Sequence, residues 1–177
     1  VKEFDLASDA GLCPVERNAL SDFYDSTKGA EWTNDTKWLD EYESYCDWHG
    51  VTCDEDKTHV TKLELANNGL SGRLRESIGH LTLMGVLDLS DNDIKGSIPT
   101  EIGKLKNLTY LRLSYNAFTG TAECLEELTK LQLLHLNSNR ITEMPNMTQF
   151  NKNENMKSAF VTDCGVPSAF NEAPKCE

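Results

Sequence analysis

The residue types that do chemistry in enzymes are present in this chain of 177 residues, but their spacing does not assemble a reaction centre. His135 falls near Arg112 in a repeated pattern, yet no serine or cysteine nucleophile with a third orienting group accompanies it. Asp88, Asp91 and Asp93 resemble a calcium-binding run, but they lack the glycine and the closing glutamate of a calcium loop. These aspartates are better explained as caps of turns. We expect no catalytic residue, no metal and no cofactor.

Six cysteines and three glycosylation sequons indicate an oxidising compartment. Most of the cysteines lie near the two ends of the chain, where they would act as staples. The sequons begin at Asn34, Asn107 and Asn146. Together these features predict passage through the secretory route and an extracellular or cell-surface location.

The net charge of −12 argues against two classes of partner. Nucleic acids and anionic membranes both select for Lys and Arg, which are outnumbered here 17 to 29 by Asp and Glu. No apolar run is long enough to span a bilayer, so no direct membrane insertion is expected in this segment. The chain begins with Val1 and without an apolar signal stretch, which suggests a trimmed or mature segment whose signal has been removed.

The middle of the chain repeats itself four times. VTKLELANNGL, MGVLDLSDNDI, LTYLRLSYNAF and LQLLHLNSNRI begin at Val60, Met84, Leu108 and Leu131. Two leucines that lie two residues apart would point inward from a short strand in each repeat, and strands of successive repeats would pair in parallel. A column of asparagines follows, which we interpret as structural because buried amides can satisfy backbone groups of the turns: Asn68, Asn92, Asn116 and Asn139.

The flanking segments are predicted to close the ends of this coil. Residues 14–24 form an expected helix whose inward stripe is Val15, Ala19, Leu20, Phe23 and Tyr24. Residues 51–53 and 58–60 form an expected antiparallel hairpin. A fifth, irregular turn is expected over residues 156–164, with Cys164 bonded to Cys176 to tie down the end. The predicted organisation is an N-terminal cap over 1–59, four repeats over 60–145, and a fifth repeat with a C-terminal cap over 146–177, all in one structural domain.

The repeats resemble leucine-rich repeats of the plant type. The segment IKGSIP after the second asparagine matches the L-x-G-x-I-P pattern of that family, which implies a second short strand in each turn. The fourth repeat has no glycine there, so the second sheet is in doubt beyond repeat three. The segment YCDWHGVTC resembles the C-x-W-x-G-V-x-C cap of the family, which implies a disulfide between Cys46 and Cys53. The pairing of Cys13 and Cys124 stays open: they could bond, remain free, or Cys13 could compete for the cap disulfide.

The fold class that follows is an α/β solenoid. It is a short right-handed leucine-rich-repeat coil of about five turns. A parallel sheet lines its concave face, a helical cap closes the N-terminal end, and a disulfide-tied cap closes the C-terminal end. The segments GAEWTNDTKWL and VTDCGVPSAFNEAPKCE resemble secreted or membrane-anchored repeat proteins of diatoms and related algae. This resemblance implies recognition of peptides, proteins or wall glycans. It also implies that a membrane anchor after Glu177 has been cut away.

Outward positions of the predicted strands form the candidate binding site. An apolar strip with tyrosine and arginine beside it is unusual on a solvated strand face, and those residue types anchor interfaces. The candidate residues on the concave face are Val86, Asp88, Tyr110, Arg112, Tyr115, Leu133, His135 and Phe160. The first hypothesis is an extracellular recognition or adhesion module that is not an enzyme and binds a protein, peptide or glycan. The alternatives are an inhibitor of a secreted hydrolase, similar to polygalacturonase inhibitors, and a structural component of the wall or cell surface.

Overall fold

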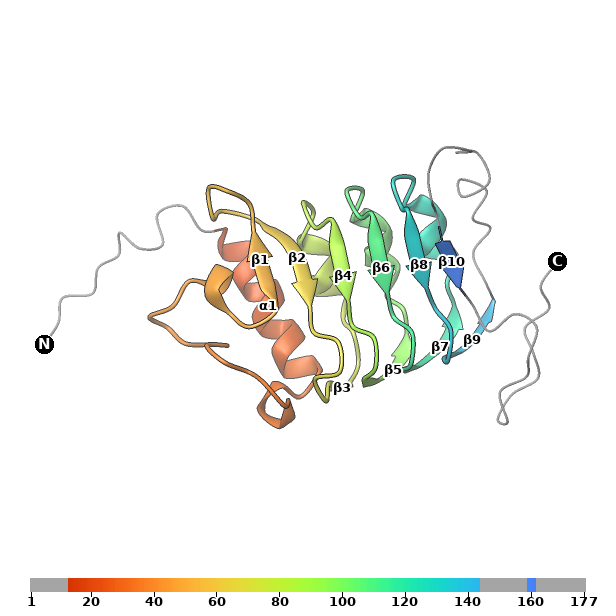
Figure 1. Ribbon diagram of the computed structural model, residues 1–177, viewed down its shortest axis with the longest axis horizontal. Helices are drawn as coiled ribbons and strands as arrows, with labels where there is room; N and C mark the ends of the chain where they lie inside the picture. The colour runs from red at the N-terminus through yellow and green to blue at the C-terminus, as the bar shows by residue number, and fades with distance from the viewer. Residues whose placement is uncertain (1–12, 144–158, 162–177) are drawn as a thin grey trace, which may run out of the picture.

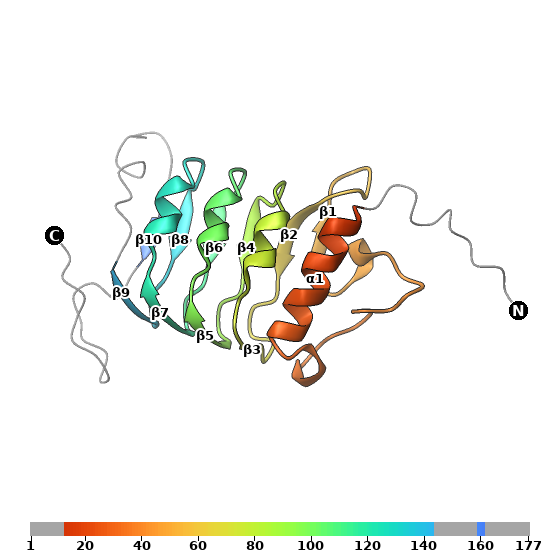
Figure 2. The same cartoon turned by 180° about the vertical axis from the view of Figure 1, so that it is seen from behind.

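The computed structural model describes residues 13–143 and 159–161, and these residues form a solenoid. Its strands lie side by side along the long axis, with the cap helix at one end (Figure 1). Figure 2 shows short helices on the opposite side of the coil. Each turn therefore contributes a strand to one wall and a helical segment to the other. No helix in the described ranges is long and apolar enough to cross a membrane.

A six-stranded sheet forms the first wall. Its order is β1 (Val51–Cys53), β2 (Val60–Glu64), β4 (Val86–Asp88), β6 (Tyr110–Arg112), β8 (Leu133–His135) and β10 (Ala159–Val161). All neighbours pair in parallel except β1 and β2, which form the predicted antiparallel hairpin. Leu63, Leu87, Leu111 and Leu134 occupy one register and are fully buried. The inward leucines and the parallel wall predicted from the repeats are confirmed.

A second sheet runs along the lower edge in Figure 1 and continues further than predicted. Its strands, in order, are β3 (Ser71–Gly72), β5 (Asp93–Ser97), β7 (Ala117–Thr121) and β9 (Arg140–Glu143). The doubt about the fourth repeat was wrong, because β9 pairs with β7 although it has no glycine. Parallel pairing uses backbone groups, so Ile141 takes its place opposite Gly120.

The opposite wall consists of short 3₁₀ helices. These are η3 (Glu76–His80), η4 (Thr100–Lys104) and η5 (Glu123–Glu127). Each helix, together with the residue that follows it, buries two apolar side chains completely. These side chains are Ile78, Leu81, Ile102, Leu105, Leu125 and Leu128. The core therefore lies between the six-stranded sheet and this wall.

The N-terminal cap begins with α1 (Pro14–Ser26), followed by η1 (Gly29–Glu31) and η2 (Tyr45–Asp47). The predicted inward stripe was wrong at one position: Val15 is 52% exposed, whereas its neighbour Glu16 is 2% exposed. Glu16 faces inward because its carboxylate accepts the backbone N–H of Val60 at 2.8 Å. A hydrogen bond to the first repeat strand thus outweighs the apolar preference at this turn of the helix.

Aromatic rings and one disulfide complete the cap. Trp32, Trp38 and Trp48 are buried and pack around Phe23 and each other, so they form cap core. Cys46 and Cys53 form a disulfide. Cys13 and Cys124 are both free thiols. The Cys164–Cys176 pair and the sequon at Asn146 lie outside the described residues.

The asparagine column bonds each turn to the next. Asn92 Oδ1 accepts the N–H groups of Asn68 and Leu70, and Asn92 Nδ2 donates to the carbonyl of Leu65 at 2.9 Å. Asn116 and Asn139 repeat the arrangement one and two turns later. These side chains satisfy backbone groups that no sheet ladder reaches, which confirms their structural interpretation.

The fifth strand of the coil is present, but its register differs from the expectation. The predicted alignment placed Phe160 level with His135, in an outward column. In the structure Phe160 pairs with Leu134, and Val161 pairs with His135. A shift of one residue exchanges the two faces of a strand. Phe160 therefore aligns with Leu134 in the strand register, one residue away from the expected alignment with His135.

Candidate functional site

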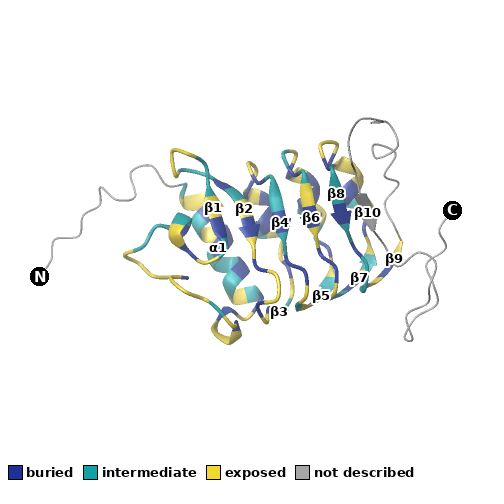
Figure 3. Cartoon of the chain, viewed as in Figure 1, coloured by how far each residue is buried: buried dark blue, intermediate teal, exposed yellow. Residues whose placement is uncertain are grey.

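The exposed face of the six-stranded sheet, called the sheet face here, carries the candidate site. Period-two alternation places Leu87 and Leu111 in the core and turns the residues on either side of them outward. Figure 3 shows exposed and half-buried positions along β4, β6 and β8 on this face. The strand pairing aligns Val86 with Tyr110 and Leu133, and Asp88 with Arg112 and His135. Six predicted residues are thus brought together as two parallel rows.

A shallow hollow of about 240 Å³ lies between β2, β4 and β6 on the sheet face. Four predicted residues line it, together with the buried Leu87 and with Glu64: Val86, Asp88, Tyr110 and Arg112. Glu64 was not among the predicted site residues, although it stands in the same column as Asp88 and pairs with it across the strands. The column alignment was the signal that could have found it.

Two of the residues that line this hollow, Asp88 and Arg112, form an ion pair. Arg112 Nη1 lies 3.4 Å from Asp88 Oδ2, and the other oxygen of Asp88 accepts both the N–H and the hydroxyl of Ser90. Asp88 is therefore held in place, while the Arg112 side chain remains 46% exposed. With Glu64, the lining of the hollow contains two carboxylates and one guanidinium.

His135 extends the polar row onto β8. Burial lowers the pKa of His135, the charge of Arg112 lowers it further, and Asp88 opposes both effects. The imidazole is consequently neutral at neutral pH and offers one donor and one acceptor. The strand register places it in one row with Arg112 and Asp88.

Two tyrosines give the site its exposed aromatic surface. Tyr110 is 42% exposed and Tyr115 is 56% exposed, while Val86 and Leu133 are half-buried beside them. Tyr115 lies in the turn after β6 with a φ of +54°, in a column whose other members are Asn67, Asp91 and Ser138. Short polar residues tolerate this left-handed conformation, whereas a bulky side chain is strained there. Tyr115 is thus an exposed aromatic residue in a conformation that the other three repeats give to a short polar residue.

Comparison with known proteins agrees with the fold. Residues 58–118 match the leucine rich repeat family. A stretch of 77 residues, 42% of the chain, is 42% identical to Phytosulfokine receptor 1 of Arabidopsis thaliana, and it corresponds to 7% of that receptor.

Solved structures of plant proteins show the same architecture. The chain resembles one in the BIR3–SERK2 complex of Arabidopsis thaliana with a TM-score of 0.64 and 26% identity, over 82% of this chain and 79% of the other. It also resembles the ectodomain of the Arabidopsis receptor kinase HAESA, solved with an IDA peptide hormone ligand. That match has a TM-score of 0.59 and 27% identity, over 81% of this chain and 23% of the other. This chain therefore has the leucine-rich-repeat fold, and its repeats are similar to those of plant leucine-rich-repeat proteins.

Proposed function

We propose that this chain is an extracellular recognition module that binds a peptide or protein segment on its sheet face. The observation that carries the proposal is the exposed Tyr110 in one hollow with the Arg112–Asp88 ion pair, together with the exposed Tyr115 in the turn after the same strand. Aromatic and arginine side chains dominate the energetics of interfaces. The leucines beneath them hold this surface rigid, so little ordering opposes binding.

The chemistry of the site favours an extended peptide with a basic side chain. The basic group would enter the hollow beside Glu64 and Asp88, and an apolar neighbour would pack on Tyr110 and Val86. The net charge of −12 supports association with a basic segment at long range. The HAESA ectodomain, a protein of the same fold, was solved with a peptide ligand. We place the chain in the secreted or membrane-anchored class that the algal resemblance suggests.

Glycosylation fits this proposal at two of the three sequons. Asn34 and Asn107 are half-buried loop residues outside the strands of the sheet. Asn107 Nδ2 donates to the carbonyl of Thr82. Neither residue is among those that line the hollow.

The test is a comparison of peptide binding between two matched double variants. Peptides selected from a displayed random library on the wild-type chain are titrated against Tyr110→Ala/Arg112→Ala and against Tyr42→Ala/Arg73→Ala. Each variant loses one tyrosine and one arginine, but Tyr42 and Arg73 are exposed outside the sheet face. We expect the first variant to weaken binding by at least tenfold, or about 1.4 kcal/mol, and the second to bind as the wild type does.

The selected peptides add a second readout. Enrichment of Lys or Arg flanked by apolar residues supports the hollow as the site. Equal affinity for both double variants, with both folded by circular dichroism, would refute the sheet face as the binding surface.

A further inference from the structure

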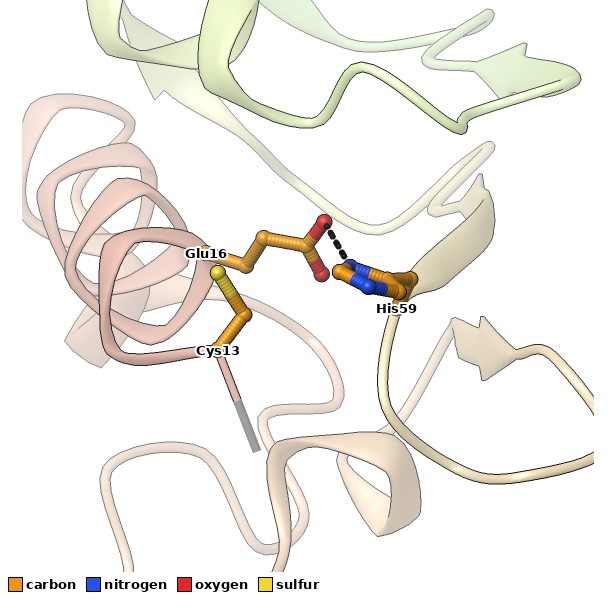
Figure 4. Close-up of side chains that lie close together, drawn as sticks. All are labelled: Cys13, Glu16 and His59. Carbon is orange, nitrogen blue, oxygen red and sulfur yellow. Dashed lines mark hydrogen bonds and ion pairs between the residues drawn. The ribbon is translucent and has the colours of Figure 1, made fainter. Parts of the chain in front are cut away.

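Three side chains of metal-ligating type meet at the start of the cap helix, at the end of the molecule away from β8. Cys13 precedes α1, Glu16 lies in its first turn, and His59 directly precedes β2 (Figure 4). One sulfur, one oxygen and one nitrogen of these residues all lie within 4.8 Å of one another. Figure 4 shows the carboxylate of Glu16 pointing at the imidazole, with the Cys13 sulfur on the helix side of it.

The Glu16 carboxyl group is buried beside a single basic side chain of the described residues. It is 2% exposed, and the one basic side chain paired with it among the described residues is His59, whose Nδ1 lies 3.2 Å from Oε1. The other oxygen accepts the N–H of Val60, a neutral donor. A buried carboxylate is costly unless a positive charge compensates it, and a bound metal ion would supply that charge.

The backbone around the cluster is fixed by further hydrogen bonds. The Tyr45 hydroxyl accepts the N–H of Cys13 at 3.2 Å and donates to the carbonyl of Thr58 at 2.7 Å. Asp54 Oδ1 accepts the N–H groups of Thr58 and His59. The two chain segments that carry the ligands are therefore held against each other before any ion binds, which reduces the cost of assembling a site.

We propose that Cys13, Glu16 and His59 bind a zinc ion. Thiolate, imidazole and carboxylate are the three ligand types of zinc, and a thiolate selects against magnesium and calcium. Bonds of about 2.1 Å at a tetrahedral angle place two ligand atoms roughly 3.4 Å apart, close to the separation of the Glu16 and His59 atoms. The His59 side chain is 41% exposed, so solvent reaches the cluster and water completes the fourth position.

The ion would join α1 to the first repeat strand. Glu16 and His59 stand 43 residues apart in the chain, so zinc would close the cap onto the coil. Because the ion binds only the folded arrangement, it would raise the thermal stability of the chain. This role is independent of ligand binding on the sheet face.

Cobalt titration of the full chain without reductant and under an oxygen-free atmosphere, so that the Cys46–Cys53 disulfide stays intact, tests the site directly. Thiolate-to-cobalt charge-transfer absorption reports a Cys ligand. We expect saturation at one ion per chain, displacement by zinc, loss of the band in Cys13→Ser, and at least tenfold weaker binding in His59→Gln. The matched controls are Cys124→Ser, at the other free thiol of the described chain, and His80→Gln, at an exposed histidine; both should titrate as the wild type does.

Thermal unfolding provides a second measurement. Zinc should raise the Tm of the wild type and of Cys124→Ser, and it should leave the Tm of Cys13→Ser unchanged. The proposal is overturned by the absence of saturable one-to-one binding, by survival of the band in Cys13→Ser, or by peptide mapping that finds Cys13 in a disulfide in the native protein.

Discussion

Asn92 accepts the backbone N–H of Asn68, the residue that holds the same position one turn earlier, at 3.1 Å. The same carboxamide oxygen accepts the N–H of Leu70, and its nitrogen donates to the carbonyls of Leu65, Leu89 and Ser90. One side chain therefore satisfies backbone groups of two successive turns. The coil is held together by this polar column as well as by its leucines, because each buried backbone group left without a partner is costly.

Replacing Asn92 by alanine should destabilise the chain strongly. The change leaves several backbone donors and acceptors of the inner turn without partners, so we expect the free energy of unfolding to fall by about 3 kcal/mol. Urea denaturation measures the difference. Lys95→Ala, on an exposed position three residues later, is the control and should stay within about 0.5 kcal/mol of the wild type. Equal stability of the two variants would show that water replaces the asparagine without cost.

Repetition is what made the solenoid predictable from the sequence. The spacing of Leu87 and Leu111 fixed both the inward face and the parallel pairing, and the asparagines fell in one column. The repeat spacing did not predict contacts between the repeats and the segments outside them. Glu16 is buried because it bonds Val60 from 44 residues away, and helical amphipathicity alone favoured Val15. Phe160 was misplaced because the segment before β10 is not a copy of the other turns, so the period did not fix its register.

The candidate sites also differ in how far the repeat spacing could predict them. Rows of aligned residues such as Asp88 and Arg112 could be predicted, because they follow from the register of the strands. The meeting of Cys13, Glu16 and His59 could not be predicted, because it depends on how the cap folds onto the first repeat. No sequence spacing typical of a metal site links them.

Gly72 joins the cap to the coil and should not tolerate a side chain. Its φ is +94°, and a Cβ atom would lie 2.3 Å from the carbonyl oxygen of Ser26. The neighbouring N–H groups of Ser71 and Arg73 bond the carbonyls of Thr27 and Ser26, so the backbone cannot move away without breaking them. We expect Gly72→Ala to lower the free energy of unfolding by about 3 kcal/mol.

Gly120 offers a matched control for Gly72. Its φ is +78°, but a Cβ atom would meet nothing closer than Ser97 Cβ at 3.8 Å. Gly120→Ala should therefore lower the free energy of unfolding by only about 1 kcal/mol, which is the cost of holding a non-glycine residue in the left-handed conformation. Thermal denaturation of the two variants separates close contact from backbone conformation. If both variants lose the same stability, the contact with Ser26 is not what Gly72 is needed for.

Stability should fall above pH 10 because of Tyr45. This side chain is fully buried, and burial raises its pKa from 10.0 to about 12. The folded chain therefore keeps the phenol proton more tightly than the unfolded chain does. That contribution is fully present below pH 10 and is lost as the pH rises towards 12, by up to roughly 2 kcal/mol.

The measurement is the pH dependence of urea denaturation between about pH 9 and pH 11. Tyr45→Phe is less stable at the lower pH, because it loses the hydrogen bond to Thr58, but its stability should decline less steeply. Tyr42→Phe changes a tyrosine that is 86% exposed and should keep the steeper decline of the wild type. Identical slopes for all three chains would contradict a raised pKa at Tyr45.

Tyr115 should show opposite effects on stability and on binding. Its φ of +54° strains a bulky residue, and asparagine adopts this conformation more readily. We expect Tyr115→Asn to raise the free energy of unfolding by about 0.5–1 kcal/mol and to weaken peptides selected on the sheet face. Tyr110→Asn is the matched control, because Tyr110 lies in β6 with no such strain and the change should not stabilise. A Tyr115→Asn chain that is less stable than the wild type would show that tyrosine is held there by packing, and the conformational argument for its functional role would then fail.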